Sequence, residues 1–233
     1  MATVIKKPAT AADLYKVADG GKAELVKGEL RLIAPTGLRP GFASSKIWLS
    51  LYQYVQAGHP GVAVGDNVGF IVDLPNRQSF SPDAAFFTGE DSGMKFAQGA
   101  PVFAVEIRSE NDYGPAAERE MAAKRADYFA AGTLVVWDAD LLGDATVRVY
   151  RSTDPDTPTV YRRGQVAEGR SRRSRMENAR RRALRLAQSP SSANDASVPN
   201  ATYGWKMTIF VSVISSTAYF GPSLPIPLSF SPP

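Results

Sequence analysis

An apolar run near the middle of the chain reads Val102-Phe103-Ala104-Val105-Glu106-Ile107-Arg108 and has the character of a β-strand. Because side chains alternate across a strand, Phe103, Val105 and Ile107 would share one face, which is the core face. Glu106 and Arg108 would share the opposite face. A carboxylate in such a run loses hydration while it keeps its charge, so it needs a cation or a proton close by. The pattern predicts a strand with a polar site on one face.

A second carboxylate, Asp83, opens another strand-like run, Ser81-Pro82-Asp83-Ala84-Ala85-Phe86-Phe87. Simpler interpretations exist: Asp83 could belong to a Pro-Asp turn, and Glu106 could form a surface ion pair with Arg108, which would add little stability. If the two strands are neighbours, however, both carboxylates face one cleft. Two hard oxygen ligands suit Mg²⁺, which can activate a water for attack on phosphorus. We therefore expect Asp83 and Glu106 to share a divalent metal.

Two residues could supply a cation next to such a metal. Arg108 follows Glu106 at a spacing that keeps both side chains on one strand face. Lys124 lies in a helix expected after Pro115. It interrupts an otherwise apolar helix face, which consists of Ala117, Met121, Tyr128 and Ala131. A lysine there either extends its ammonium to solvent or reaches a carboxylate site.

The rest of residues 1–168 alternates between helical and extended patterns. Helices are expected after Thr10, over residues 43–57, and between Pro115 and Gly132. Strands are expected in a hairpin at residues 24–33, at 62–72, 83–87 and 102–108, in a central strand at 133–137, and in edge strands at 147–150 and 159–161 that Asp154-Pro155-Asp156 separates. This order predicts an α/β domain with a mixed β-sheet flanked by helices.

Composition excludes several kinds of chemistry. The chain has no cysteine and one histidine, His59, so thiol nucleophiles, disulfide frameworks and structural zinc are excluded. His59 lies in the turn-like stretch Gly58-His59-Pro60-Gly61, and we expect it to be an exposed loop residue. Catalysis would then depend on carboxylates, lysine, arginine, hydroxyl groups or a hard cation.

The amino-terminal residues carry no readable secretory signal. Residues 1–10 lack an apolar core segment, which makes a cytoplasmic location the expectation. The longest apolar stretch, residues 207–214, is far shorter than the roughly 20 residues that a membrane-spanning helix requires. No membrane partner is expected.

Positive charge is concentrated in residues 169–233. Nine of the 27 basic residues and two of the 23 acidic residues lie there, a local net charge of +7 against −3 for residues 1–168. This segment is Arg-rich, then Ser-rich, then interrupted by prolines, and it shows no periodicity, so we expect a largely disordered tail. Clustered arginines could instead form an arm that binds nucleic acid.

Taken in order, these motifs resemble the PD-(D/E)xK nuclease superfamily and, within it, the Uma family of restriction-endonuclease-like proteins. The similar stretches are Glu24-Leu25-Val26-Lys27-Gly28-Glu29-Leu30, Pro35-Thr36-Gly37, Ser81-Pro82-Asp83-Ala84-Ala85-Phe86, Val105-Glu106-Ile107-Arg108-Ser109, and Lys124-Arg125-Ala126-Asp127-Tyr128-Phe129-Ala130-Ala131-Gly132 through Trp137. The resemblance covers residues 10–165. It implies a restriction-endonuclease-like nuclease domain at residues 1–168.

The resemblance also implies an activity and a site. The activity is cleavage of DNA phosphodiester bonds that depends on Mg²⁺ or Mn²⁺, with Asp83 and Glu106 as metal ligands and Glu24 as a further acidic residue at the metal. A solvated hairpin residue is the simpler interpretation of Glu24. DNA is the implied partner, and a homodimer is compatible with the resemblance.

The chain departs from the family pattern at two places. Arg108 stands where the motif has lysine, and a guanidinium stays protonated, so it can stabilise charge but cannot act as a base. Lys124 could take the lysine role. Residues 169–233 resemble nothing in the family, and a reading-frame shift near Gly169 would produce such a loss of pattern.

A second hypothesis is a nuclease-fold module that binds nucleic acid or a protein without cleaving it. The arginine at position 108 favours it, and so does the negative charge of residues 1–168, which is a poor electrostatic match for DNA.

Overall fold

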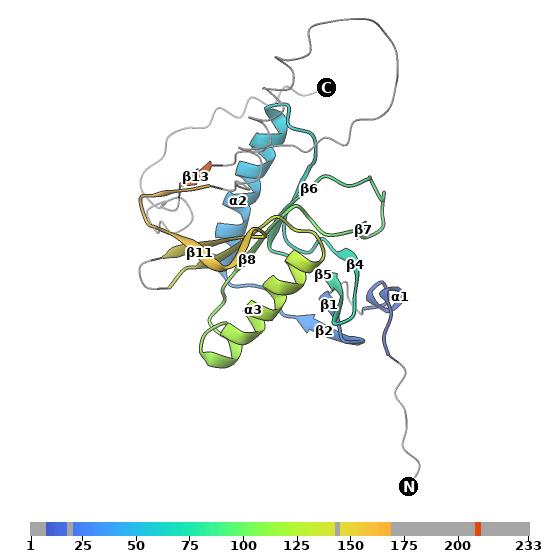
Figure 1. Ribbon diagram of the computed structural model, residues 1–233. Coiled ribbons are helices and arrows are strands. Elements are labelled where there is room, and N and C mark those ends of the chain that lie inside the picture. The colour runs from blue at the N-terminus through green and yellow to red at the C-terminus, as the bar shows by residue number, and fades with distance from the viewer. Residues whose placement is uncertain (1–7, 18–20, 143–144, 169–207, 211–233) are drawn as a thin grey trace, which may run out of the picture.

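The computed structural model describes residues 8–17, 21–142, 145–168 and 208–210 (Figure 1). Its helices are α1 (Ala11–Leu14), α2 (Leu38–Gln56) and α3 (Pro115–Ala130). Its strands are β1 (Lys22–Val26), β2 (Glu29–Ile33), β3 (Val62–Val64), β4 (Phe70–Leu74), β5 (Arg77–Phe80), β6 (Ala84–Phe87), β7 (Ala97–Gln98), β8 (Phe103–Ile107), β9 (Val135–Asp140), β10 (Thr146–Arg151), β11 (Asp154–Arg162), β12 (Val166–Glu168) and β13 (Thr208–Phe210).

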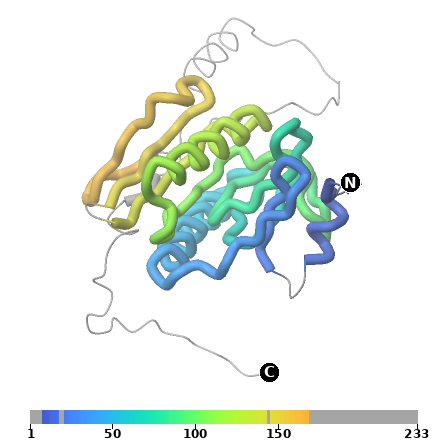
Figure 2. Tube along the Cα trace, turned by 90° about the horizontal axis from the view of Figure 1, so that it is seen from below, coloured from blue at the N-terminus to red at the C-terminus, as the bar shows by residue number. Residues whose placement is uncertain are grey.

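The larger sheet is mixed, as predicted. Its strand order is β11-β10-β9-β8-β6-β3, and β8 pairs with β9 in parallel and with β6 antiparallel. A second sheet has the order β2-β1-β5-β4-β7. Figure 2 shows the β10–β11 hairpin at one end of the molecule and the β1–β2 hairpin at the other. The α/β fold class with flanking helices is therefore confirmed.

Strand β8 has two different faces. Its side chains Phe103, Val105 and Ile107 belong to the core cluster that includes Ile47 and Leu51 of α2. Ala104 belongs to a separate cluster on the other face of the strand, together with Tyr128 of α3. The two helices thus cover opposite faces of this sheet, and Glu106, which alternates with the α2-facing residues, lies on the α3 face. The predicted division of β8 into a core face and a polar face is confirmed.

The β4–β5 hairpin was not predicted. Strand β5 reads Arg77-Gln78-Ser79-Phe80, which shows no alternation of apolar residues and gives no strand signal. Three of these four residues are nevertheless buried, including Arg77 and Ser79. Their polar atoms form buried hydrogen bonds with β1. These hydrogen bonds make burial of the strand possible although its sequence has no apolar alternation.

Some predicted boundaries were wrong. Helix α2 begins at Leu38, five residues before the predicted start, and Pro40 in its first turn is tolerated because the first backbone N–H groups of a helix have no partner within the helix. Asp154-Pro155-Asp156 does not separate two strands but forms the start of β11. Proline is accepted there because β11 is an edge strand.

Three residues of the predicted tail form a strand. Thr208–Phe210 is β13, and it pairs antiparallel with β12, where Ala167 lies opposite Ile209. The Arg-rich run and the remaining predicted disorder lie outside the described residues. The domain boundary at residue 168 stays a prediction.

Candidate active site

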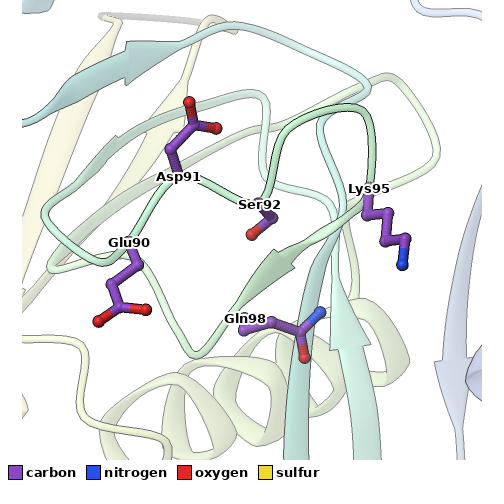
Figure 3. Close-up of a pocket in the computed structure, with 5 residues that line it drawn as sticks. All are labelled: Glu90, Asp91, Ser92, Lys95 and Gln98. Atoms are coloured by element: carbon purple, nitrogen blue, oxygen red, sulfur yellow. The ribbon is translucent and has the colours of Figure 1, made fainter.

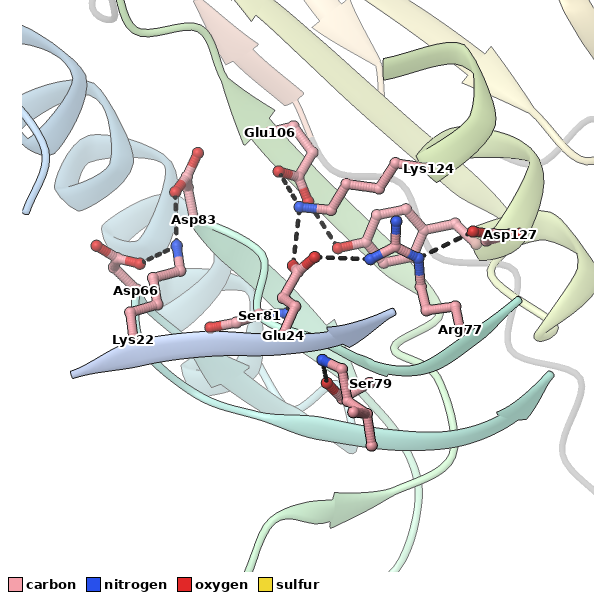
Figure 4. Close-up of polar contacts among 12 residues, drawn as sticks. Lys22, Glu24, Asp66, Arg77, Ser79, Ser81, Asp83, Glu106, Lys124 and Asp127 are labelled. Carbon is pink, nitrogen blue, oxygen red and sulfur yellow. Dashed lines mark hydrogen bonds and ion pairs between the residues drawn. The ribbon is translucent and has the colours of Figure 1, made fainter. Parts of the chain in front are cut away.

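Four of the residues proposed from the sequence come together on the α3 side of β8 (Figure 4). Glu24 comes from β1, Asp83 precedes β6, Glu106 lies in β8, and Lys124 comes from α3. These positions are 100 residues apart along the chain at the extremes. Sheet pairing and the packing of α3 on the sheet bring them into one network.

Asp83 is held next to β8 by two backbone contacts. Its N–H donates to the carbonyl of Val105 over 3.0 Å, and the Ile107 N–H donates to Asp83 Oδ2 over 2.7 Å. The paired residues Ala84 and Val105 are each one position away from Asp83 and Glu106. The two carboxylates therefore lie on neighbouring strands, as the sequence predicted.

Lys124 reaches the carboxylates and does not extend to solvent. Its Nζ lies 2.7 Å from Glu106 Oε2 and 2.9 Å from Glu24 Oε1. Burial by itself would lower the pKa of Lys124, but the charges of Glu106 and Glu24 outweigh that effect and raise it. Lys124 is therefore a protonated ammonium shared by two acids.

Glu24 is a buried residue, so its interpretation as a solvated hairpin residue was wrong. Its side chain accepts hydrogen bonds from Arg77 Nη1 over 2.6 Å and from the Ser81 N–H over 2.9 Å. Burial would raise the pKa of Glu24, but Lys124 and Arg77 outweigh it, and the pKa lies below its usual value. Glu24 is an ionised anchor for Lys124.

The pKa of Glu106 moves in the opposite direction. Burial is the main reason that the pKa of Glu106 is raised to about 7. The charges of Asp83 and Glu24 also raise this pKa, whereas the Lys124 ammonium lowers it. The Lys124 ammonium does not offset the effect of burial on this carboxyl group. A further cation beside Glu106 would favour its ionised form.

Residues that the sequence analysis missed complete the network. The Tyr128 hydroxyl donates to Glu106 Oε1 over 2.6 Å, and its ring stacks on Phe80. Arg77 Nε donates to Asp127 Oδ2 over 2.9 Å. Tyr128 was placed on the Lys124 face of this helix but not at the site, and Asp127, three residues after Lys124, is at a helical spacing that could have placed it nearby. Arg77 gave no such signal, because its strand was not predicted.

Lys22 is a second ammonium at the site. Its Nζ lies 2.6 Å from Asp66 Oδ1 and 3.1 Å from Asp83 Oδ1 (Figure 4). Burial lowers the pKa of Lys22, but Asp83, with Asp66 and Glu106, outweighs burial and raises it. Its position two residues before Glu24 on one strand face was the signal that could have found it.

Arg108 lies on the predicted face of the sheet but turns away from the carboxylates. Its guanidinium makes two 2.7 Å hydrogen bonds to Asp138 on β9 and further bonds to Glu118 on α3, and these bonds raise its pKa. None of the described contacts joins Arg108 to Glu106, so the surface ion pair considered for them is not formed. Arg108 is 3% exposed and links β8, β9 and the start of α3.

The donor set fits a hard divalent cation in its chemistry. Asp83 and Glu106 offer carboxylate oxygens, the ligands that Mg²⁺ prefers. Among the described residues, no group of three or more His, Cys, Asp or Glu side chains is arranged to hold a metal. If Asp83 and Glu106 bind the cation, water and substrate oxygens would supply the remaining ligands.

Two other features lie apart from this network. A hollow of about 550 Å³ on the connection from β6 to β8 is lined by Glu90, Asp91, Ser92, Lys95 and Gln98, and none of these is a site residue (Figure 3). His59 is exposed, as predicted, and its ring stacks on Tyr54.

The mixed sheet and the helices on its two faces define an α/β protein, which carries an acid-lysine network on one sheet face. The chain belongs to the Uma2 family, described as "Putative restriction endonuclease", whose family model matches residues 11–179. The resemblance seen in the sequence is confirmed. The match runs past residue 168, so the expectation that residues 169–233 resemble nothing in the family was wrong for residues 169–179.

A solved structure shows the same fold. It is described as a "putative nuclease belonging to DUF820 from Anabaena variabilis ATCC 29413", and it matches with a TM-score of 0.53 and 19% sequence identity. The match covers 67% of this chain and 86% of that chain. No curated protein matches this chain. Within the described ranges, no helix has the length and apolar character needed to cross a membrane.

Proposed function

We propose that this protein is a metal-dependent endonuclease that hydrolyses DNA phosphodiester bonds with Mg²⁺ or Mn²⁺. Membership of a restriction-endonuclease family supports a nuclease-type function. The observation that carries the proposal is the Lys124 ammonium, held between Glu106 and Glu24 on the sheet face where Asp83 is fixed.

The chain's own residues have separate tasks in this proposal. Asp83 and Glu106 would hold the metal, which when bound activates a water and neutralises charge that develops on the phosphate. The Ile107 N–H orients the Asp83 carboxylate. Lys124 places a positive charge beside the metal-binding carboxylates, where it would stabilise the negative charge of the attacked phosphate.

Lys124 takes the role of the motif lysine in this proposal, and Arg108 does not. The Arg108 guanidinium is already fully engaged with Asp138 and Glu118, so it would have to break buried ion pairs to approach a substrate. Glu24 would act indirectly: Arg77 and the Ser81 N–H fix its carboxylate, and the carboxylate fixes Lys124.

Plasmid cleavage with added Mg²⁺ tests the proposal. We expect Asp83→Asn and Glu106→Gln each to lower the cleavage rate by at least about 100-fold, a typical loss when a preorganised electrostatic group is removed. The matched control is Glu120→Gln, which changes an exposed carboxylate that has no described partner. Equal cleavage by wild type and both site variants would reject the proposal.

The same experiment decides the non-catalytic alternative. Wild-type protein that binds DNA or RNA but cleaves neither, with any metal, would be a nuclease-fold binding module. Its net charge of −3 over residues 1–168 is the observation that favours this alternative. A cytoplasmic location and a homodimeric state stay predictions, which fractionation and size-exclusion chromatography would check.

A further inference from the structure

The two oxygens of Asp83 are held by very different donors. Oδ2 accepts from the backbone N–H of Ile107 within the sheet, and that donor cannot leave without breaking the pairing of β6 and β8. Oδ1 faces the Lys22 ammonium at the end of a flexible side chain. A metal that binds Asp83 would therefore compete with Lys22 more readily than with the backbone.

Lys22 has a second acceptor to which it can move. Asp66 Oδ1 is nearer to its Nζ, at 2.6 Å against 3.1 Å for Asp83, and the Asp66 side chain is 38% exposed. The ammonium can give up Asp83 and still keep an ion pair at the edge of the site. A bound divalent cation would repel it in that direction.

Lys124 has no comparable alternative. Its two partners, Glu106 and Glu24, are both nearly buried, and Glu24 is fixed by Arg77 and by the Ser81 N–H. If Lys124 moved, one buried acid would lose its partner, and an unpaired buried charge is costly in free energy. The two lysines of the site thus differ: one is held firmly and the other can be exchanged.

We propose that Lys22 is an exchangeable counter-ion of the metal site: its ammonium, which contacts both Asp83 and Asp66, gives up Asp83 and keeps Asp66 when a divalent metal binds. This inference rests on the proposed function only for the identity of Asp83 as a metal ligand. Lys22 is a positioning residue in this account, because it holds the Asp83 carboxylate in place and sets how tightly the metal binds.

Calorimetric titration with Mn²⁺, without DNA, tests this exchange. Removing the ammonium in Lys22→Met removes the competitor, so we expect Mn²⁺ to bind at least about tenfold more tightly, the equivalent of one charge-assisted hydrogen bond. Lys22→Arg keeps the charge and should bind Mn²⁺ as wild type does. Lys16→Met changes an exposed lysine whose described ion pair is with Asp13 and not with a site residue, and should also leave affinity unchanged.

Measurements at high salt and a second variant distinguish exchange of the Lys22 ammonium from a through-space effect of its charge. The gain in Lys22→Met should persist at high salt, where a through-space effect of the lost charge is screened. Asp66→Asn keeps Lys22 but removes the negative charge of its second acceptor, so Mn²⁺ should bind more weakly than to wild type. This variant also serves if Lys22→Met fails to fold.

Each outcome has a defined meaning. Unchanged Mn²⁺ affinity in Lys22→Met, or unchanged or tighter binding in Asp66→Asn, would overturn the exchange, and so would a wild-type protein that binds no Mn²⁺. A wild-type protein that binds Mn²⁺, shows the expected changes and yet cleaves no DNA would instead sustain the exchange and reject the proposed nuclease function.

Discussion

At the scale of single residues, two cations on the same side of the larger sheet have different environments. Lys124 contacts two acids of the candidate site, whereas Arg108 contacts Asp138 and Glu118 outside it. Both were candidates for the catalytic cation from the sequence. Their contacts lead to separate predictions, one for activity and one for stability.

Lys124→Met should impair cleavage while leaving metal binding in place. It removes the charge proposed to stabilise the phosphate but none of the proposed metal ligands, so the cleavage rate should fall by about 100-fold or more. Single-turnover cleavage and Mn²⁺ titration measure the two properties. Loss of Mn²⁺ binding together with activity would show that Lys124 maintains the carboxylates and does not act on the substrate.

Arg108→Met should destabilise the fold. It leaves Asp138, which is 1% exposed, without its two hydrogen bonds from the guanidinium, and breaking a buried ion pair costs about 3–5 kcal/mol. Urea denaturation would show this loss in the free energy of unfolding, and the double variant with Asp138→Asn should recover part of it. Arg119→Met, at an exposed position of α3, is the control. A drop in cleavage with unchanged stability would instead assign Arg108 to catalysis.

At the scale of elements, α3 connects the sheet to the site. Its side chains Glu118, Lys124 and Asp127 pair with Arg108 directly after β8, Glu106 in β8 and Arg77 in β5, respectively. The hydrophobic contribution of α3 is concentrated in Tyr128, its one fully buried residue in the described structure. The position of this helix therefore depends on polar contacts more than that of α2, which buries Ala43, Ile47 and Leu51.

Tyr128→Phe tests that dependence. The ring keeps its stacking on Phe80, but Glu106 loses a 2.6 Å hydrogen bond, so we expect a loss of about 1–3 kcal/mol in the free energy of unfolding. Tyr52→Phe, at an exposed tyrosine of α2, should change stability far less. Denaturant titration of both variants gives the comparison. Equal effects would show that the hydroxyl of Tyr128 adds nothing to the position of α3.

Sequence patterns predicted the elements better than the contacts between them. Alternation around Glu106 and helical spacing around Lys124 placed both side chains on the correct faces. The partners of Arg108 could not be predicted, because they depend on the parallel pairing of β8 with β9 and on where α3 begins. Arg77 was missed because polar strands that are buried by ion pairs carry no hydrophobic pattern.

At the scale of the whole molecule, charge is divided between the nuclease-like region and the remainder of the chain. Residues 169–233 carry a net charge of +7, while residues 1–168, which hold every residue of the candidate site, carry −3. The family match ends at residue 179. Only β13 of the later residues is described, and it pairs with β12.

A fragment of residues 1–168 tests the role of the remainder. We expect it to cleave DNA with unchanged rate and to unfold at a lower temperature, because β12 loses its pairing with β13. Cleavage assays and thermal unfolding measure these effects. If the Arg-rich segment binds DNA, the fragment would instead show weaker DNA affinity and a smaller dependence on salt concentration, since each phosphate contact releases counterions.

The central claim is that Asp83 and Glu106 together hold one divalent cation. Titration of Mn²⁺ into wild type, Asp83→Asn and Glu106→Gln, each verified to be folded by circular dichroism, tests it most directly. We expect one Mn²⁺ bound per wild-type chain and loss of binding in both variants. Unchanged Mn²⁺ binding in either folded variant would contradict it.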